Sequence, residues 1–178
     1  MYDLFVLGQL MDQDMTGYQL RKALKAVVGT EQTMSYGVLY PLLERLATTG
    51  SLQLTTEQTA ARTKKWAAIT EAGRRSFHQL VLTPVVINKQ AQLMFQIKCS
   101  CLHLLRTAEK VAILQDFHAF TQGQLVQLRE IQAYFKDRPR MQPNDVVDEL
   151  QINQLQQFRA QAQADWITSR LASLTEGE

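Results

Sequence analysis

The chain has few of the residues that usually carry catalysis or cross-linking. Its 178 residues include two cysteines, three histidines, four prolines and eight glycines. No HExxH motif or paired-carboxylate arrangement occurs, and no second ligand pair lies at a zinc-like spacing from the cysteines. We therefore expect no enzyme activity, no catalytic residue, no metal and no cofactor.

The two cysteines, Cys99 and Cys101, stand only two positions apart. Such a pair is poorly placed to bridge to itself in a helix, which argues for a reducing compartment. Two cysteines with His103 nearby also suit a redox or metal sensor. The alternative is that they are small apolar residues on a helix.

Long apolar runs are missing too. The longest uncharged run, Ser76 to Asn88, has 13 residues and contains Pro84, whereas a membrane-spanning helix needs about 20. Asp3 stands where a secretory signal would carry Lys or Arg. The sequence therefore predicts a cytoplasmic protein with no membrane partner.

The net charge of +2 is small, but it is unevenly placed. Residues 1–83 carry nine Lys and Arg against seven Asp and Glu, and the remainder carries ten against ten. Within residues 59–75, five basic residues face Glu71 alone. A local basic cluster of this kind can meet phosphate.

Three helices are predicted in the first 50 residues. Apolar residues at helical spacing indicate one over residues 2–12. A capping-box pattern, Thr16 with Gln19 three residues on, starts a second. A third follows Ser35, with its buried stripe formed by leucines and its outward face formed by Tyr36, Gly37, Tyr40, Pro41 and Glu44.

After Gly50 the apolar period changes from about 3.6 to 2, which predicts a two-stranded hairpin over residues 52–56 and 63–69. Thr70 then caps another helix that runs to about Leu82. Helix, short turn, helix and basic hairpin in this order is the pattern of a winged helix-turn-helix.

From residue 85 onward strand signals nearly vanish and glutamine becomes abundant. Three helices are predicted, over residues 85–105, 107–136 and 145–175, with the last two forming an antiparallel pair. Because two or three helices enclose little core, we expect a second copy of the chain to cover their apolar stripe. The predicted fold is mostly α with a small β-hairpin, with a DNA-binding domain at 1–83 and a helical dimerisation and effector domain at 84–178.

Four motifs occur in the first 80 residues. They are Gly17-Tyr18, Ser35-x-Gly37-x-Leu39-Tyr40-Pro41-x-Leu43-x-Arg45-Leu46-x-x-x-Gly50, Arg62-x-Lys64-Lys65-Trp66, and Ile69-Thr70-Glu71-Ala72-Gly73-Arg74. With these motifs the first 80 residues resemble the PadR-like family of transcriptional regulators. Phe95-x-x-Lys98 and the following helices resemble the branch with a large helical carboxy-terminal domain.

This resemblance implies a homodimeric repressor of pseudo-palindromic operator DNA that a small aromatic effector, such as a phenolic acid, releases. A multidrug-responsive repressor, an activator and a winged-helix protein-interaction module that does not bind DNA remain alternatives. The helical domain offers Met94, Phe95, Phe117, Phe120 and Trp166 to an effector cavity, although aromatics at this spacing also suit a dimer core.

The candidate DNA-binding residues fall in three groups. At the start of the second helix, Thr16 and Tyr18 are placed for phosphate contact. On the third helix, small and aromatic residues can approach base edges, and in the hairpin, basic residues can flank the groove. The second and third groups are Ser35, Tyr36, Gly37 and Tyr40, and Arg62, Lys64 and Lys65. For the tyrosines the alternative is ordinary partial burial, and for the lysines it is a solvated strand edge.

Overall fold

The computed structural model describes residues 1–178 except 29–33, 60–61, 137–142 and 176–178. Met1–Arg106 and Thr107–Glu178 form two compact units. The first unit contains α1 (Tyr2–Leu10), β1 (Met15–Thr16), α2 (Gly17–Val28), α3 (Tyr36–Thr48), β2 (Leu52–Thr59), β3 (Arg62–Ile69), α4 (Glu71–Leu82), α5 (Ala91–Ser100) and the short 3-10 helix η1 (Leu102–Leu104). The second contains α6 (Thr107–Lys136) and α7 (Pro143–Thr175).

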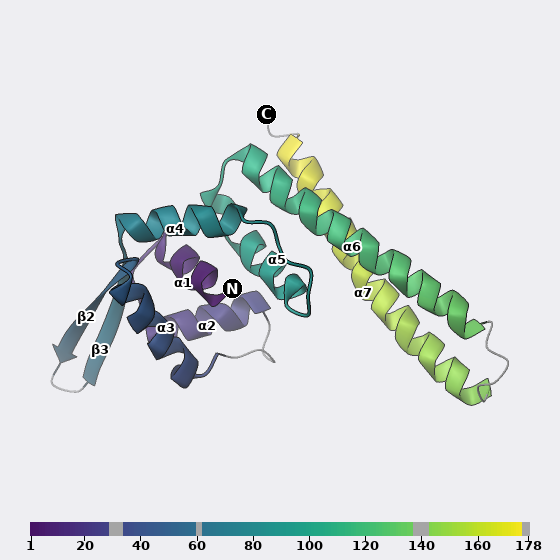
Figure 1. The fold of residues 1–178 in the computed structure, drawn as a ribbon, viewed down its shortest axis with the longest axis horizontal. Helices are drawn as coiled ribbons and strands as arrows, with labels where there is room; N and C mark the ends of the chain where they lie inside the picture. Colours follow the sequence, from purple (N-terminus) through teal and green to yellow (C-terminus); the bar gives the residue numbers. More distant parts are fainter. Residues whose placement is uncertain (29–33, 60–61, 137–142, 176–178) are drawn as a thin grey trace. The chain divides into compact units, whose positions relative to one another are not determined.

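Helix α1 is the centre of the first unit. Its residues 4–8 and Leu10 are all buried, and it packs against α2, α4 and α5. A helix that is apolar around most of its circumference must lie inside the core. Figure 1 shows it enclosed between α4 and α2, with the β2–β3 hairpin extending away from the helical body.

The sheet has three strands rather than the two that the sequence predicted. Strands β2 and β3 pair from Leu52↔Ile69 outward, as expected for the hairpin, and β1 adds to the other edge of β3 through Met15↔Ala67 and Thr16↔Trp66. The two-residue strand β1 is continuous with the start of α2. The base of the hairpin is thereby paired to the residues that open α2.

Two of the three predicted helix caps are formed as expected. Thr16 N donates to Gln19 Oε1 at 2.8 Å and Gln19 N donates to Thr16 Oγ1 at 3.4 Å, which closes the capping box of α2. Thr70 Oγ1 accepts from Gly73 N at 3.1 Å at the start of α4. Ser35 occupies the cap position of α3 but makes no side-chain capping hydrogen bond.

A single residue with positive φ sits between α3 and β2. Gly50 has φ +72°, a conformation that costs a residue with a side chain free energy and that glycine adopts readily. It lets the chain turn directly from the helix into the hairpin, and Ser51 N then donates to Leu46 O at 2.9 Å.

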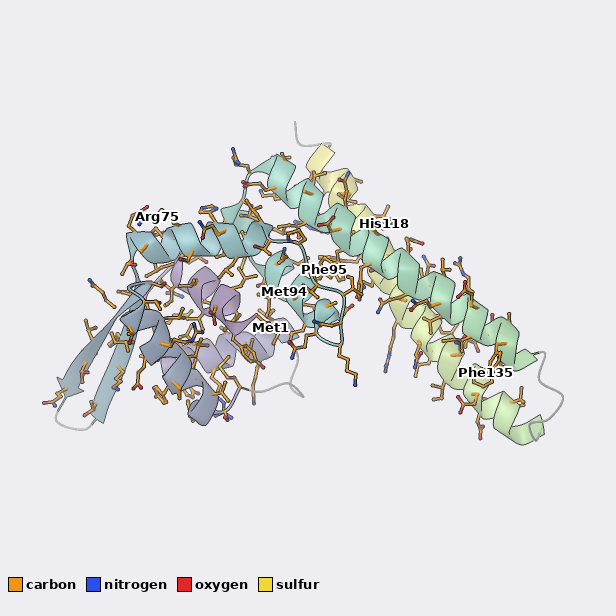
Figure 2. The ribbon with its side chains drawn as sticks, viewed as in Figure 1. Met1, Arg75, Met94, Phe95, His118 and Phe135 are labelled. Atoms are coloured by element: carbon orange, nitrogen blue, oxygen red, sulfur yellow. The ribbon has the colours of Figure 1, made fainter. Side chains whose placement is uncertain are left out.

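Helix α5 lies with the first unit, whereas the sequence analysis assigned residues 84–105 to the second domain. It contacts α1 and α2, and the buried Lys98 donates from Nζ to Thr83 O at 2.5 Å, at the end of α4. Figure 2 labels Met94 and Phe95 on this helix, and Phe95 is buried. By contacts, the compact units divide after Arg106.

The second unit is an antiparallel pair of long helices. Its direction follows from two polar contacts between them, Gln163 Nε2 to Thr121 Oγ1 at 2.6 Å and Asn153 Nδ2 to Leu128 O at 3.0 Å. Thr121 and Asn153 are buried, so both contacts lie within the helix–helix interface. Figure 1 shows α6 and α7 side by side along their length. The prediction of a mostly helical chain with a small antiparallel sheet is confirmed.

Among the described helices, none combines the length and the apolar character that a membrane span requires.

Candidate nucleic-acid interface

Helix α3 has the two faces that its sequence predicted. Its buried residues are Leu39, Leu42, Leu43 and Leu46. The exposed side is formed by Ser35 at the cap and by Tyr36, Gly37, Tyr40, Pro41 and Glu44. Tyr36 and Tyr40 are each 38% exposed, so both side chains are partly buried and partly accessible to solvent.

A groove of about 330 Å³ lies between the start of α2, the exposed side of α3 and the hairpin strand β3. Strand β1 contributes Thr16; α2 contributes Gly17, Tyr18 and Gln19; α3 contributes Tyr40; and β3 contributes Thr63, Lys64, Lys65 and Trp66. Five of the predicted residues, Thr16, Tyr18, Tyr40, Lys64 and Lys65, thus meet around one groove. We call this the α2–α3–wing groove.

Of the remaining predicted residues, Ser35, Tyr36 and Gly37 are not part of the described groove lining. Ser35 and Gly37 are exposed near the start of α3, and Tyr36 reaches the groove indirectly through Tyr40, against which its ring stacks at a centroid distance of 5.8 Å. Arg62 belongs to β3, but its side chain lies outside what the structure describes.

Charges of both signs border the groove. Lys64 and Lys65 are exposed on β3, and Lys65 Nζ lies 3.7 Å from Glu44 Oε1 on α3. An exposed ion pair of this kind adds about 0–1 kcal/mol to stability, so phosphate can compete for the lysine. The pair connects the hairpin to α3 across the groove.

Arg45, the one basic residue of α3, is not part of the groove lining. Its Nη2 lies 2.6 Å from Asp3 Oδ1, near the start of α1. This ion pair to α1 is a structural contact.

Two groove residues, Gln19 and Trp66, and Arg21 of α2 were not anticipated from the sequence as contact residues. Gln19 was assigned only as part of a cap, Trp66 only as part of a motif, and Arg21 was not considered. Trp66 Nε1 donates to Glu57 Oε2 at 2.8 Å across the hairpin, and the Arg21 guanidinium lies 4.7 Å from the centroid of the Tyr36 ring. The sequence signal that could have identified Arg21 is its position one helical turn after Gly17, on the same face of α2.

The cysteines do not form a sensor-like cluster in the described part of the chain. Cys101 is buried beside Gly8, Cys99 is half-buried, and His103 Nε2 lies 3.0 Å from Asp12 Oδ2. No group of three or more His, Cys, Asp or Glu side chains suited to a metal occurs among the described residues.

The aromatic residues named for an effector cavity differ in their surroundings. Phe95 and Phe117 are buried, and the Phe117 and Phe120 rings stack at 6.5 Å. Trp166 on α7 is 46% exposed. Because some of these side chains are buried and Trp166 is exposed, their exposure does not indicate a shared effector site.

The order of helices and strands in the first unit, with an exposed aromatic face on α3 beside a basic hairpin, defines a winged helix-turn-helix. Residues 6–79 match the model of the transcriptional regulator PadR-like family. The match spans less than half of the chain, and over these residues the chain is similar to transcriptional regulators of the DNA-binding winged-helix type.

Several solved structures are similar to the chain at low sequence identity. Bacillus subtilis PadR in complex with operator DNA is 20% identical, with 97% of this chain and 98% of that chain covered and a TM-score of 0.47. The same protein in complex with p-coumaric acid is 19% identical over 97% and 98%, with a TM-score of 0.42.

A PadR-like transcriptional regulator from Bacillus cereus is 23% identical over 99% of both chains, with a TM-score of 0.38. No curated protein sequence matches the chain.

Proposed function

We propose that the chain is a dimeric repressor that binds pseudo-palindromic operator DNA through the α2–α3–wing groove and leaves it when a small aromatic effector binds. The observation that carries this proposal is the groove itself. It gathers a helix start, an exposed tyrosine of α3 and two hairpin lysines on one face of the first unit.

The chemistry of the groove suits duplex DNA. Lys64 and Lys65 supply positive charge for backbone phosphates, which position a protein on the duplex without reading its sequence. Tyr40 on α3 supplies a phenol that can hydrogen-bond or pack against a base edge in the major groove. Tyr18, 63% exposed at the start of α2, is free to reach the adjacent phosphates.

Two copies of the chain would account for binding to a pseudo-palindromic operator. In a homodimer, both α3 helices would enter successive major grooves about one helical turn apart. Release requires an effector that binds one dimer geometry better than the other, because a ligand without differential affinity shifts no equilibrium.

DNA binding is tested by fluorescence-anisotropy titration of a duplex from immediately upstream of the chain's own gene, against a scrambled duplex of equal length and at equal salt. We expect the protein to bind the upstream duplex at least roughly a thousandfold more tightly than the scrambled duplex. Equal affinity for the two duplexes would contradict a regulator of its own region and favour a protein-interaction module.

The role of α3 is tested with Tyr40→Ala and Tyr40→Phe. Removing the ring should cost about 1–3 kcal/mol in binding to the upstream duplex, while the phenylalanine variant keeps the packing and reports on the hydroxyl alone. Wild-type affinity of Tyr40→Ala would remove α3 from the interface.

The effector class is tested on the preformed complex. Release by p-coumaric acid, the compound in the Bacillus subtilis PadR structure, supports a phenolic-acid sensor. Release by cationic drugs and not by aromatic acids would support a regulator of an exporter instead.

A further inference from the structure

The start of α3 lacks the side-chain cap that often orders a helix terminus. Ser35 holds the cap position without a side-chain capping bond. Gly37 has open space around it, with Ser35 Oγ as the nearest atom, 3.7 Å from where a Cβ would be. Backbone hydrogen bonds from Val38 N and Leu39 N to Ser35 O order the first turn, and contacts from elsewhere in the fold can then set the orientation of the Tyr36 and Tyr40 rings.

Those contacts come from α2. Gly17 and Arg21 are four residues apart on α2, and Tyr36 and Tyr40 are four residues apart on α3, so each pair lies on one face of its helix. The Tyr40 ring lies against Gly17, where an added Cβ would be 3.3 Å from Tyr40 Cε1 and 3.4 Å from its hydroxyl oxygen. We call these four residues the tyrosine clamp.

The rest of the clamp is closed by ring contacts. The Tyr36 and Tyr40 rings are stacked with centroids 5.8 Å apart and an interplanar angle of 24°. The Arg21 guanidinium carbon lies 4.7 Å from the Tyr36 centroid. A backbone position of α2 therefore supports one end of the tyrosine pair, and a cation of α2 supports the other.

The Arg21 side chain is suited to this role. Its Nε is buried and makes no hydrogen bond to any residue that the structure describes. A planar guanidinium over a ring face is attracted by the ring quadrupole, and partial removal from water strengthens the attraction. Lysine would supply the charge without the planar stack.

Ordering the rings before binding matters for recognition. Side chains that are already fixed lose less conformational entropy when DNA binds, and each rotamer-rich side chain that is immobilised at an interface otherwise weakens binding. Both tyrosines remain 38% exposed, so the clamp fixes the rings without covering them.

We infer that Arg21 is a positioning residue for operator recognition, which holds the Tyr36–Tyr40 pair in its binding orientation by stacking on Tyr36. The inference rests on the proposed function, since it concerns DNA binding by α3. It assigns to Arg21 a contribution to the choice of sequence and not to the general affinity for DNA.

The test is a double-mutant cycle of Arg21→Met and Tyr36→Ala, titrated on the upstream and scrambled duplexes over a range of salt. We expect Arg21→Met to weaken binding to the upstream duplex about three- to tenfold, the range that corresponds to a cation–π contact at tenfold per 1.4 kcal/mol. Binding to the scrambled duplex and the salt dependence should stay unchanged. In the Tyr36→Ala background, the same change should have almost no effect.

Lys22→Met is the matched control, because Lys22 is an exposed cation at the next position of α2. Any effect of that variant should be the same on both duplexes. Arg21→Lys covers the case in which Arg21→Met fails to fold, as checked by circular dichroism. It keeps the charge, and we expect the same loss on the upstream duplex alone.

Each of the following results would overturn the inference. Equal weakening on both duplexes with a salt slope reduced by about one unit would make Arg21 a phosphate contact. Additive effects in the cycle would separate it from Tyr36. Wild-type discrimination by Arg21→Met would leave the proposed function standing without this role, whereas a wild-type protein that does not discriminate the duplexes would end both.

Discussion

Burial changes the chemistry of Cys101 more than its position in the sequence indicates. Removal of the side chain from water raises the pKa of its thiol from 9.0 to about 11; the hydrogen bond with Ser100 opposes this shift and the nearby Asp12 adds to it. The thiol is therefore protonated at neutral pH, and an unreactive thiol fits the interpretation of Cys101 as a small core residue.

This pKa predicts a loss of stability at alkaline pH. The folded state holds the proton more tightly than the unfolded state, so the contribution of Cys101 is complete below pH 9 and is lost as the pH rises towards 11. Two pKa units correspond to a loss of about 2–3 kcal/mol. Urea unfolding at pH 8 and pH 10.5 should show a smaller decline for Cys101→Ala than for the wild type.

Cys99→Ala provides the control for that measurement, because Cys99 is only half-buried and its variant should decline as the wild type does. The other ionisable side chains are common to the wild type and both variants. Equal declines in the wild type and Cys101→Ala would contradict the assignment.

At the scale of single residues, the sequence predicted which side chains are exposed better than it predicted their partners. The outward face of α3 follows from helical spacing alone. The Arg45–Asp3 pair and the Arg21–Tyr36 contact join residues on different helices. Periodicity within one helix carries no information on which residue of another helix lies opposite.

Among the elements, the hairpin is the one on which non-specific DNA affinity should depend most. Lys64→Ala should weaken binding to upstream and scrambled duplexes alike and reduce the slope of log affinity against log salt by about one unit, because one phosphate contact and its counterion release are lost. The measurement is a salt titration by anisotropy.

Lys89→Ala is the comparison for this variant, since Lys89 is exposed in the segment between α4 and α5 and is not part of the groove lining. It should bind both duplexes with the wild-type slope. A wild-type slope for Lys64→Ala would exclude Lys64 from the phosphate contacts.

The boundaries of helices with a long apolar periodicity were predicted well. Elements that form only through pairing with another strand were predicted poorly. Helices α6 and α7 begin and end within a few residues of their expected limits. Strand β1 has two residues, too few to show any period, and it exists because β3 has a free edge beside it. Helix α5 is shorter than predicted because residues 84–90 precede it without helical structure.

For the whole molecule, the surface of α7 predicts how copies assemble. Ile152, Leu155, Phe158 and Trp166 are between 44% and 64% exposed, on a helix whose other side already packs against α6. Large apolar side chains left open at helical spacing mark an interaction site. We expect Phe158→Ser combined with Trp166→Ser to convert the proposed dimer to a monomer in sedimentation-velocity experiments.

Leu80→Ser is the matched control, because Leu80 is a similarly exposed apolar residue of α4 in the other unit. It should sediment as the wild type does. The monomeric variant should also bind the upstream duplex more weakly, because two linked half-sites bind with an effective concentration that separate units lack. A dimer that survives both serine substitutions would move the interface off α7.

The pairing of β1 with β3 limits how this regulator can be redesigned. Because Thr16 faces Trp66 in the sheet and also closes the cap of α2, the hairpin is not an independent module. A hairpin grafted from a relative with different operator preference would have to bring its own version of Met15 and Thr16. If the hairpin were exchanged alone, it would disturb the start of α2 and therefore the contact between Gly17 and the Tyr40 ring.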